Sequence, residues 1–412
     1  MVSEVQTEPV QAEPARGGSA ALLQFDSDSA VELVATLVEK AVESRATDIH
    51  IEPRRHDFQI RYRVDGFLYL VAQVDKNTGR EIVSRIKILA DMDITERRLP
   101  QDGHFRFGTD AAEYDMRIST VPTHFGERME IRLAEGGKIF TRIQELGMNE
   151  AEVETVNGFI RRPHGIVLAT GPVGSGKTTT LYSCISHIDK NVVNVMTIED
   201  PIEYIIPGAN QIEVNYRVNF DFVHGLRAIL RQDPNVILVG EIRDEETARI
   251  AIRAGMTGML VFSTLHSNDA VGAVTTLANF HINRFLIANA LVGAVAQRLV
   301  RKICPECAKS VKLTESLKKA LRVTEADARK SYSLRKGDGC DACLGTGYRG
   351  RTGVFEVFPV TPRCRTLIMN NESEESIRTA AVEDGMTPLH EAALAKVREG
   401  VTTVDEFVRV IG

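Results

Sequence analysis

The first third of the chain combines two hydrophobic periods. Residues 27–44 place apolar side chains at helical spacing behind Ser and Asp residues that suit a helix N-cap. Residues 47–71 and 104–134 alternate apolar and polar positions, as half-buried strands do, and a second helix is expected at about 76–90. We therefore predict a smaller α+β domain over residues 29–134.

From about residue 151 the pattern changes to short apolar runs that alternate with helical segments. This alternation predicts βαβ units and a parallel sheet. Every run ends in polar or charged residues, and in open α/β sheets the functional site gathers at the carboxyl ends of the strands. The candidate buried strands are residues 165–171, 192–200, 235–242 and 259–266.

The other segments complete a predicted domain plan. Residues 1–28 are rich in Glu, Pro, Ala, Gly and Ser, show no lasting periodicity and are expected to form a disordered tail. Residues 135–150 contain three glycines and are expected to form a linker. The βαβ core is expected at 151–300, a loop-rich cysteine module at 301–350, and a short β segment followed by small helices at 351–412.

Composition narrows the class of protein. The chain has 412 residues, of which 43% are apolar and 26% charged, typical of a soluble globular protein. A net charge of −6 makes nucleic acid an unlikely partner, because no excess of basic charge is available to neutralise phosphates. No apolar run approaches 18 residues and the start lacks a secretory signal, so we expect a cytoplasmic protein without a membrane span.

A phosphate-binding loop is the strongest motif. Gly171, Gly176, Lys177 and Thr178 satisfy G-x-x-x-x-G-K-[ST], and the run lies between an apolar strand and a predicted helix. That context argues against a chance glycine-rich turn. The motif predicts ATP as ligand, with Lys177 at the β and γ phosphates and Thr178 as a Mg²⁺ ligand. The predicted nucleotide-binding residues are Gly171, Pro172, Val173, Gly174, Ser175, Gly176, Lys177, Thr178 and Thr179.

Acidic residues stand at two other predicted strand ends. Glu241 ends the apolar run "NVILVGEI", a usual position for the acid that supports Mg²⁺ through water, and "TIEDPIEY" supplies Glu199, Asp200 and Glu203. Hydrolysis of a phosphate requires a carboxylate that organises the metal and a group that activates water. Each acid alone could be a solvated loop end, but the four together favour catalysis. His266, in "STLHSND", is either a structural histidine or a γ-phosphate contact.

Four of the six cysteines form the pattern C-x₂-C-x₃₂-C-x₂-C: Cys304, Cys307, Cys340 and Cys343. In a chain without an export signal, paired Cys-x-x-Cys turns favour a metal over disulfides. Four thiolates suit tetrahedral Zn²⁺ and leave no open coordination position, so the zinc would be structural. The alternative is four free buried thiols. Cys184 and Cys364 stand apart as isolated residues.

Taken together, these motifs resemble the assembly ATPases of type II secretion and type IV pilus systems, the GspE/PulE/PilB-like family. The resemblance rests on "GPVGSGKTTTLY", "TIEDPIEY", "LRQDPNVILVGEIRD" and "STLHSND", with "ATDIHIEP" and "LPQDGHFRF" upstream and "GYRGRTGVFEV" downstream. It spans about residues 30–410. It implies an α/β fold in which a RecA-like P-loop NTPase domain follows a PAS-like α+β domain and carries a zinc-binding insert and a helical C-terminal part.

The resemblance also implies a mechanism. The chain would be a Mg²⁺-dependent ATPase working as a homo-hexamer, peripheral at the cytoplasmic face of the inner membrane through a platform protein and other secretion or pilus components. Glu203 would be the catalytic base and Glu241 the Walker B acid. Arg117 and Arg132, on predicted strands of the first domain, would reach the γ-phosphate. ATP hydrolysis would then move that domain against the P-loop domain.

Several alternatives stay open. Longer family members carry a further N-terminal docking domain, whereas about 30 residues precede the shared part here, which leaves the docking partner open. A related retraction or conjugation ATPase is one alternative, although retraction-type members generally lack the cysteine module. A nucleic-acid motor and a scaffold that binds ATP without hydrolysing it are the others. Arg227, Arg231 and Arg243 are candidates for a subunit contact.

Overall fold

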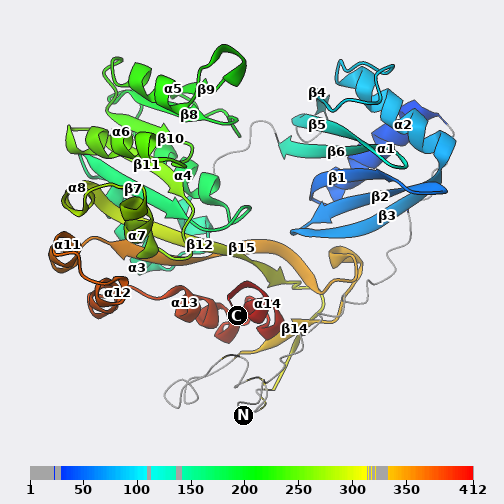
Figure 1. Cartoon of the computed structure of the whole chain (residues 1–412). Helices are drawn as coiled ribbons and strands as arrows, with labels where there is room; N and C mark the ends of the chain where they lie inside the picture. Colours follow the sequence, from blue (N-terminus) through cyan, green and yellow to red (C-terminus); the bar gives the residue numbers. More distant parts are fainter. Residues whose placement is uncertain are drawn as a thin grey trace, which may run out of the picture. The chain divides into compact units, whose positions relative to one another are not determined.

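The computed structural model describes residues 23, 29–108, 113–135, 142–312, 314, 317, 321 and 333–411. The chain forms two compact units (Figure 1). The first unit comprises residues 1–136, 303–309 and 336–350, and the second comprises residues 137–302, 310–335 and 351–412. The predicted disordered tail lies outside the described residues except at Leu23, whose backbone N–H donates to the Val71 carbonyl at 2.7 Å.

The first unit is built on a six-stranded sheet with the order β3-β2-β1-β6-β5-β4. All five neighbouring pairs are antiparallel. The helices and strands predicted between residues 29 and 134 are confirmed. They are α1 (Ala30–Glu43), β1 (Ala46–Pro53), β2 (Asp57–Val64), β3 (Phe67–Asp75), α2 (Lys76–Leu89), β4 (Gln101–Gly108), β5 (Glu113–Thr123) and β6 (Gly126–Glu135).

The two faces of this sheet differ in polarity. On β2, Phe58, Ile60, Tyr62 and Val64 are buried against α1 and α2, while the residues between them are partly exposed. The opposite face carries charged side chains such as Asp48, whose carboxylate pairs with arginines of β2 and β6. Alternation at a period of two therefore separates an apolar core from an ion-paired face.

The second unit contains a seven-stranded sheet with the order β15-β12-β7-β11-β10-β8-β9. The strands from β12 to β9 are parallel in every neighbouring pair, which confirms the predicted parallel sheet. The strands are β7 (Gly165–Thr170), β8 (Val195–Glu199), β9 (Asn210–Glu213), β10 (Val236–Val239), β11 (Leu260–Leu265), β12 (Leu291–Ile303) and β15 (Tyr348–Pro359).

Three of these strands go beyond the sequence-based expectation, and the first is β9 at residues 210–213, where no strand was predicted. No strand was predicted at residues 291–303, and only a short β segment was expected after residue 350. The structure has β12 there, and β15 runs for 12 residues. An Ala- and Val-rich run such as "LVGAVAQRLV" suits a buried helix or strand equally well. Parallel pairing of β12 with β7 decides between the two.

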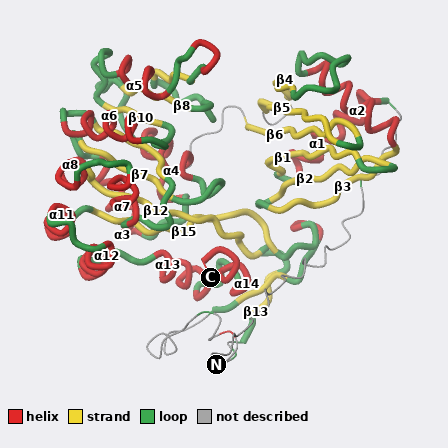
Figure 2. Tube along the Cα trace, viewed as in Figure 1, coloured by secondary structure: helices red, strands yellow, loops and turns green. Residues whose placement is uncertain are grey.

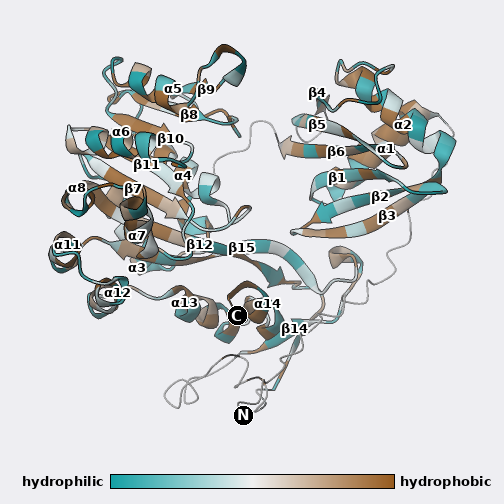
Figure 3. Cartoon of the chain, viewed as in Figure 1, coloured by the Kyte–Doolittle hydropathy of each residue, from teal (hydrophilic) through white to brown (hydrophobic). Residues whose placement is uncertain are grey.

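Helices cover both faces of this sheet, as Figure 2 shows (strands yellow, helices red). Along β7, Ile166 and Leu168 belong to one core cluster, whereas Val167 and Ala169 belong to the other. The central strands are therefore buried on both faces and mostly hydrophobic, as the brown stretches of ribbon in Figure 3 show. One face is covered by α5 (Phe222–Ile229), α6 (Glu245–Met256), α7 (Gly272–Asn279) and α8 (Arg284–Ala290), and the other by α3 (Glu150–Ile160) and α4 (Lys177–Ser186).

The C-terminal part is helical. It comprises α11 (Pro362–Met369), α12 (Glu374–Glu383), α13 (Leu389–Arg398) and α14 (Val404–Ile411). A buried ion pair attaches α14 to β12, because Glu406 is fully buried and accepts from Arg301 at 2.8 Å. The short strands β13 (Ala308–Ser310) and β14 (Arg335–Gly337) pair with each other.

The described part of the expected linker contributes to the second unit. Ile143, in the 3₁₀ turn η1 (Ile143–Glu145), and Met148 are buried in its core, and the Gly353 N–H donates to the Leu146 carbonyl at 2.9 Å. None of the helices in the described part of the chain combines the length and the apolar character that a membrane crossing requires.

Two helix glycines in the second unit provide a matched test of its packing. A Cβ added at Gly255 of α6 would lie 3.0 Å from the carbonyl carbon of Gly165 in β7, whereas a Cβ at Gly158 of α3 would meet nothing within 4 Å. We expect Gly255→Ala to destabilise the unit by about 1–3 kcal/mol through overpacking. Gly158→Ala should stabilise it by about 0.5–1 kcal/mol, because alanine is the better helix former.

Scanning calorimetry of both variants checks this prediction. The unfolding midpoint should fall for Gly255→Ala and rise slightly for Gly158→Ala. An unchanged midpoint for Gly255→Ala would show that the helix can move away from β7 at little cost.

Candidate active site

The ends of four parallel strands meet at one edge of the second unit's sheet. Because β7, β11, β10 and β8 are neighbours and parallel, the loops that follow them lie side by side. A cavity of about 290 Å³ lies among these loops. Its lining includes Lys177, Thr178, Glu203, Glu241 and His266, all of which the sequence singled out.

The phosphate loop has the backbone that its glycines predict. Gly174 and Gly176 have φ of 74° and 88°, in the left-handed region that favours glycine, and α4 starts at Lys177. The N–H groups of a helix N-terminus and its positive dipole end favour an anion. The loop therefore has the conformation required to hold a phosphate.

Lys177 lies on this loop. Its Nζ donates to the carbonyls of Gly171 at 2.9 Å and of Pro172 at 3.0 Å. Burial lowers the pKa of Lys177, and Glu241 acts in the opposite direction. A half-buried ammonium at the loop supplies the cation that the β and γ phosphates of a nucleotide require.

A residue of β12 supports the loop from behind, and the sequence analysis missed it. The Nε2 of Gln297 donates to the Ser175 carbonyl at 2.7 Å, and both residues are buried. A Cβ at Gly171 would lie 2.6 Å from the Gln297 carbonyl oxygen, so only glycine fits there without a shift. The only signal in the sequence was a glutamine within an apolar run, which does not point to a loop 122 residues away.

The acids at the strand ends have different environments. Glu241, with 16% of its side chain exposed, forms an ion pair with Arg243, and the Nε2 of His266 lies 4.0 Å from the other Glu241 oxygen. Asp200 accepts from the Tyr216 hydroxyl at 3.0 Å. Glu203 is partly exposed and lines the cavity. Glu203 and Glu241 therefore present carboxylates to the space beside the phosphate loop.

Glu199 is buried instead, with 3% of the residue exposed. One carboxylate oxygen accepts from the Tyr182 hydroxyl. The other accepts from Thr197 Oγ1 at 2.6 Å and from Gln211 Nε2 at 3.1 Å. With both oxygens accepting internal hydrogen bonds, Glu199 is placed to hold structure in position rather than to receive a proton from water.

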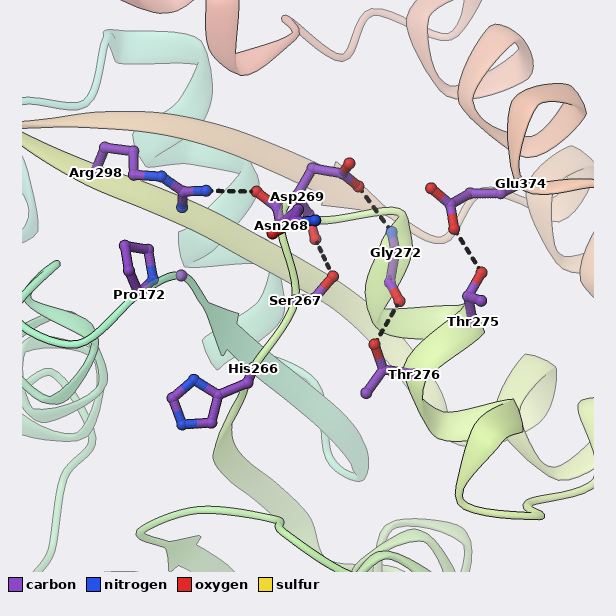
Figure 4. A pocket seen from close by; sticks show the side chains of 11 residues that line it. Pro172, His266, Ser267, Asn268, Asp269, Gly272, Thr275, Thr276, Arg298 and Glu374 are labelled. Carbon is purple, nitrogen blue, oxygen red and sulfur yellow. Dashed lines mark hydrogen bonds between the residues drawn. The ribbon is translucent and has the colours of Figure 1, made fainter. Parts of the chain in front are cut away.

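His266 lies between this cavity and a second one of about 420 Å³, since it lines both. Figure 4 shows the second cavity and the bonds that hold the turn after His266. Arg298 donates to the Asn268 carbonyl at 2.8 Å, Ser267 Oγ donates to the Asp269 carbonyl at 3.0 Å, and the Gly272 N–H donates to Asp269 Oδ1 at 2.8 Å. The turn is thus fixed, while 58% of the His266 side chain is exposed.

Arg378 of α12 connects the C-terminal helices to the same turn. Its Nη2 donates to Asp269 Oδ2 at 2.8 Å and to Glu374 at 3.0 Å. The buried Glu356 of β15 accepts from the Ala270 N–H at 2.8 Å, and burial raises the pKa of this carboxyl. The histidine turn is therefore anchored from β12, β15 and α12.

The two arginines predicted to reach the γ-phosphate belong to the first unit. Arg117 and Arg132 are register partners on β5 and β6 of the first unit. Within that unit, Arg117 Nε lies 3.7 Å from Asp115, and Arg132 Nε lies 3.2 Å from Asp48. Their role at the γ-phosphate stays a prediction from the family resemblance.

The candidates for a subunit contact have partners within the second unit. Arg227 pairs with Glu246 at 2.5 Å, and Arg231 donates to the Arg227 carbonyl at 2.9 Å. Arg243 differs from both because it lines the cavity and pairs with Glu241. A subunit-contact role for the three stays a prediction.

The four paired cysteines form one cluster in the first unit. All four sulfurs lie within 4.8 Å of one another, and three of the separations are 3.7, 3.8 and 3.9 Å. Sulfurs bound at 2.3 Å around a tetrahedral ion are about 3.8 Å apart. The N–H groups of Gly339 and Gly347 donate to Cys307 and Cys343 at 3.3 and 3.2 Å, as suits thiolate acceptors. The donor set therefore fits a tetrahedral thiophilic cation. Cys184 and Cys364 are buried and stand apart from it.

Comparison with known proteins agrees with this geometry. A family model described as type II/IV secretion system protein matches residues 24–409. Type II secretion system protein HxcR of Pseudomonas aeruginosa is 43% identical over 385 residues, covering 93% of this chain and 78% of that protein. The type IV pilus assembly ATPase PilB of Thermus thermophilus is 41% identical over 386 residues, covering 94% of this chain and 43% of that protein.

Solved structures show the same fold. The ATPase DotB of Legionella pneumophila superimposes with a TM-score of 0.68 at 19% identity, covering 93% of this chain and 96% of that one. With the family model spanning most of the sequence and relatives above 40% identity, the chain belongs to the type II/IV secretion system protein family.

Proposed function

We infer that this chain is an ATPase that hydrolyses ATP to drive the assembly of a pilus or pseudopilus in a type II secretion or type IV pilus system. The observation that carries this conclusion is one cavity in which a phosphate loop with Lys177 and Thr178 faces the carboxylates of Glu203 and Glu241. A loop that holds phosphate beside two carboxylates has the groups that phosphoryl transfer to water requires.

Each residue has a distinct task in this proposal. The loop N–H groups and Lys177 bind the β and γ phosphates. The Thr178 hydroxyl and, through water, the Glu241 carboxylate hold Mg²⁺, an ion that prefers oxygen ligands. When bound, Mg²⁺ neutralises charge that develops on the phosphates. Glu203 accepts the proton of the attacking water, and His266 contacts the γ-phosphate.

The environments of the three glutamates support Glu203 as the base. Glu199 is buried and its oxygens accept three internal hydrogen bonds. Glu241 pairs through one carboxylate oxygen with the Arg243 guanidinium. Glu203 lines the cavity and follows Pro201 in a turn that borders the phosphate loop.

The oligomeric state, location and partners proposed for this chain are those of its family. We propose a homo-hexamer of RecA-like domains, each with a PAS-like first domain, at the cytoplasmic face of the inner membrane. A membrane-embedded platform protein and other secretion or pilus components would be its partners. Extension is favoured over retraction by the cysteine cluster, since retraction-type members generally lack that module.

The base assignment is tested by Glu203→Gln. We expect ATP binding to persist while kcat falls by about 10²-fold or more, because an amide cannot accept the proton of water. ATPase rates and the affinity for a fluorescent ATP analogue measure the two effects. Glu154→Gln, which neutralises an exposed carboxylate on α3, is the matched control and should behave as wild type. A Glu203→Gln variant that turns over at the wild-type rate would move the role of base to Glu241.

The cysteine cluster is proposed to hold one structural Zn²⁺. The separations between its sulfurs match a tetrahedral thiolate site, and four protein ligands leave no position for substrate. The zinc would stabilise residues 301–350 without taking part in ATP hydrolysis.

Elemental analysis of protein purified without chelator should find about one zinc per chain, as a single four-thiolate site requires. Cys343→Ser should lose the metal and lower the unfolding midpoint, whereas Cys364→Ser should retain zinc because Cys364 lies outside the cluster. A folded wild-type protein with no zinc and four titratable thiols would refute the assignment.

A further inference from the structure

The turn that carries Glu203 is attached to the phosphate-loop helix through one buried acceptor. Tyr182 lies on α4, the helix that starts at Lys177, and its hydroxyl donates to Glu199 at the end of β8. Tyr182 and Glu199 are 1% and 3% exposed. The segment after Glu199 leads directly to Glu203. Tyr182 therefore connects the element that binds phosphate to the element that carries the proposed base.

Gln211 of β9 completes the attachment from the other side. Its Nε2 donates to Glu199 at 3.1 Å and to the Tyr204 carbonyl at 3.0 Å, and its Oε1 accepts from the Ile206 N–H at 2.6 Å. Glu203 stands immediately before Tyr204. The backbone that follows Glu203 is thus hydrogen-bonded through Gln211 to the Glu199 carboxylate, and the backbone before Glu203 continues directly from Glu199.

We propose that Tyr182 is a positioning residue for hydrolysis, which acts through Glu199 and Gln211 to set the place of the Glu203 carboxylate relative to the phosphate loop. The inference rests on the proposed role of Glu203 and adds a group that does not touch the substrate. General-base catalysis requires the base within hydrogen-bond reach of the attacking water, so a shift of about 1 Å in the turn can cost up to 10²-fold in rate.

The surroundings of Tyr182 suit a fixed donor. Burial, reinforced by the hydrogen bond to Glu199, raises the pKa of Tyr182 above its ordinary value, so the hydroxyl keeps its proton at physiological pH. Tyr204 packs against the Tyr182 ring edge to face, with ring centroids 6.4 Å apart. This ring contact is made by carbon atoms and would survive the removal of either hydroxyl.

Tyr182→Phe removes the hydroxyl and keeps the ring. We expect kcat for ATP to fall by about 10-fold or more, while the KM for ATP and the affinity for a fluorescent ATP analogue change less than about twofold. Gln211→Leu should give the same separation of kcat from KM. The matched control is Tyr204→Phe, which removes a hydroxyl from the neighbouring ring and should leave kcat unchanged. Stoichiometric nucleotide binding reports the folded fraction of each preparation.

A merely structural Tyr182 would give another signature. In that case the number of nucleotide sites per chain would fall and the kcat per remaining site would stay at the wild-type value. This outcome, or an unchanged kcat in Tyr182→Phe, would overturn the proposal.

The double variant Tyr182→Phe/Glu203→Gln tests whether Tyr182 acts through Glu203. If Tyr182 acts by positioning the Glu203 carboxylate, its hydroxyl has no base to position once Glu203 is replaced by Gln. Tyr182→Phe should then lower kcat less than about twofold relative to the Glu203→Gln single variant. Fully additive losses would overturn the proposal. A Glu203→Gln variant with wild-type turnover would instead move the role of base to Glu241, which is a failure of the proposed base and is measured without any change at Tyr182. The two failures are therefore distinguishable.

Discussion

Parallel pairing of β7, β11, β10 and β8 is the constraint on which the site depends. Their registers place the carboxyl ends of all four strands at one edge, so the phosphate loop, the "EDPIEY" turn, Glu241 and His266 follow neighbouring strands. The two core clusters that take alternate residues of each strand keep the sheet buried on both faces. Since one-residue slippage would exchange these faces, burial also fixes the register of the catalytic loops.

The edge of the sheet beyond β7 gives the phosphate loop its rigidity. Gln297 of β12 holds the Ser175 carbonyl, and Arg298 next to it holds the turn after His266. Arg378 and Glu356 attach that turn to the C-terminal helices. These four buried or half-buried side chains thus connect the two loops to elements far away in the sequence. Gln297 supports the phosphate loop directly, whereas Arg298, Arg378 and Glu356 support the turn after His266.

The three glutamates at the strand ends differ in their burial and in their hydrogen-bond and ion-pair partners. Glu199 is buried and accepts from three donors, Glu241 forms an ion pair with Arg243, and Glu203 lines the cavity. The separate roles proposed for these glutamates follow from their different burial and neighbours. Lys177 shows the same dependence, because burial and Glu241 act on its pKa in opposite directions.

The sequence by itself determined the local elements and the chemistry of the motifs. Periodicity located the helices and strands from residue 30 to 135 and the four central strands of the second unit, because burial imposes a period of two on a sheet and a period of 3.6 on a helix. The glycine spacing determined the phosphate loop, since positive φ at Gly174 and Gly176 excludes most other residues. The paired Cys-x-x-Cys turns likewise predicted that the four cysteine sulfurs lie together.

Only the tertiary structure decided that residues of β12 and β15 form long strands and which distant segments are joined by hydrogen bonds. An apolar run such as residues 291–296 carries no local preference strong enough to choose strand over helix, and the pairing with β7 makes that choice. The partnership of Tyr182 with Glu199 and that of Gln297 with Ser175 depend on which elements pack together. A hydrogen bond that joins groups 17 or 122 residues apart leaves no periodic trace in the sequence, because its partners are brought together by the burial of other residues.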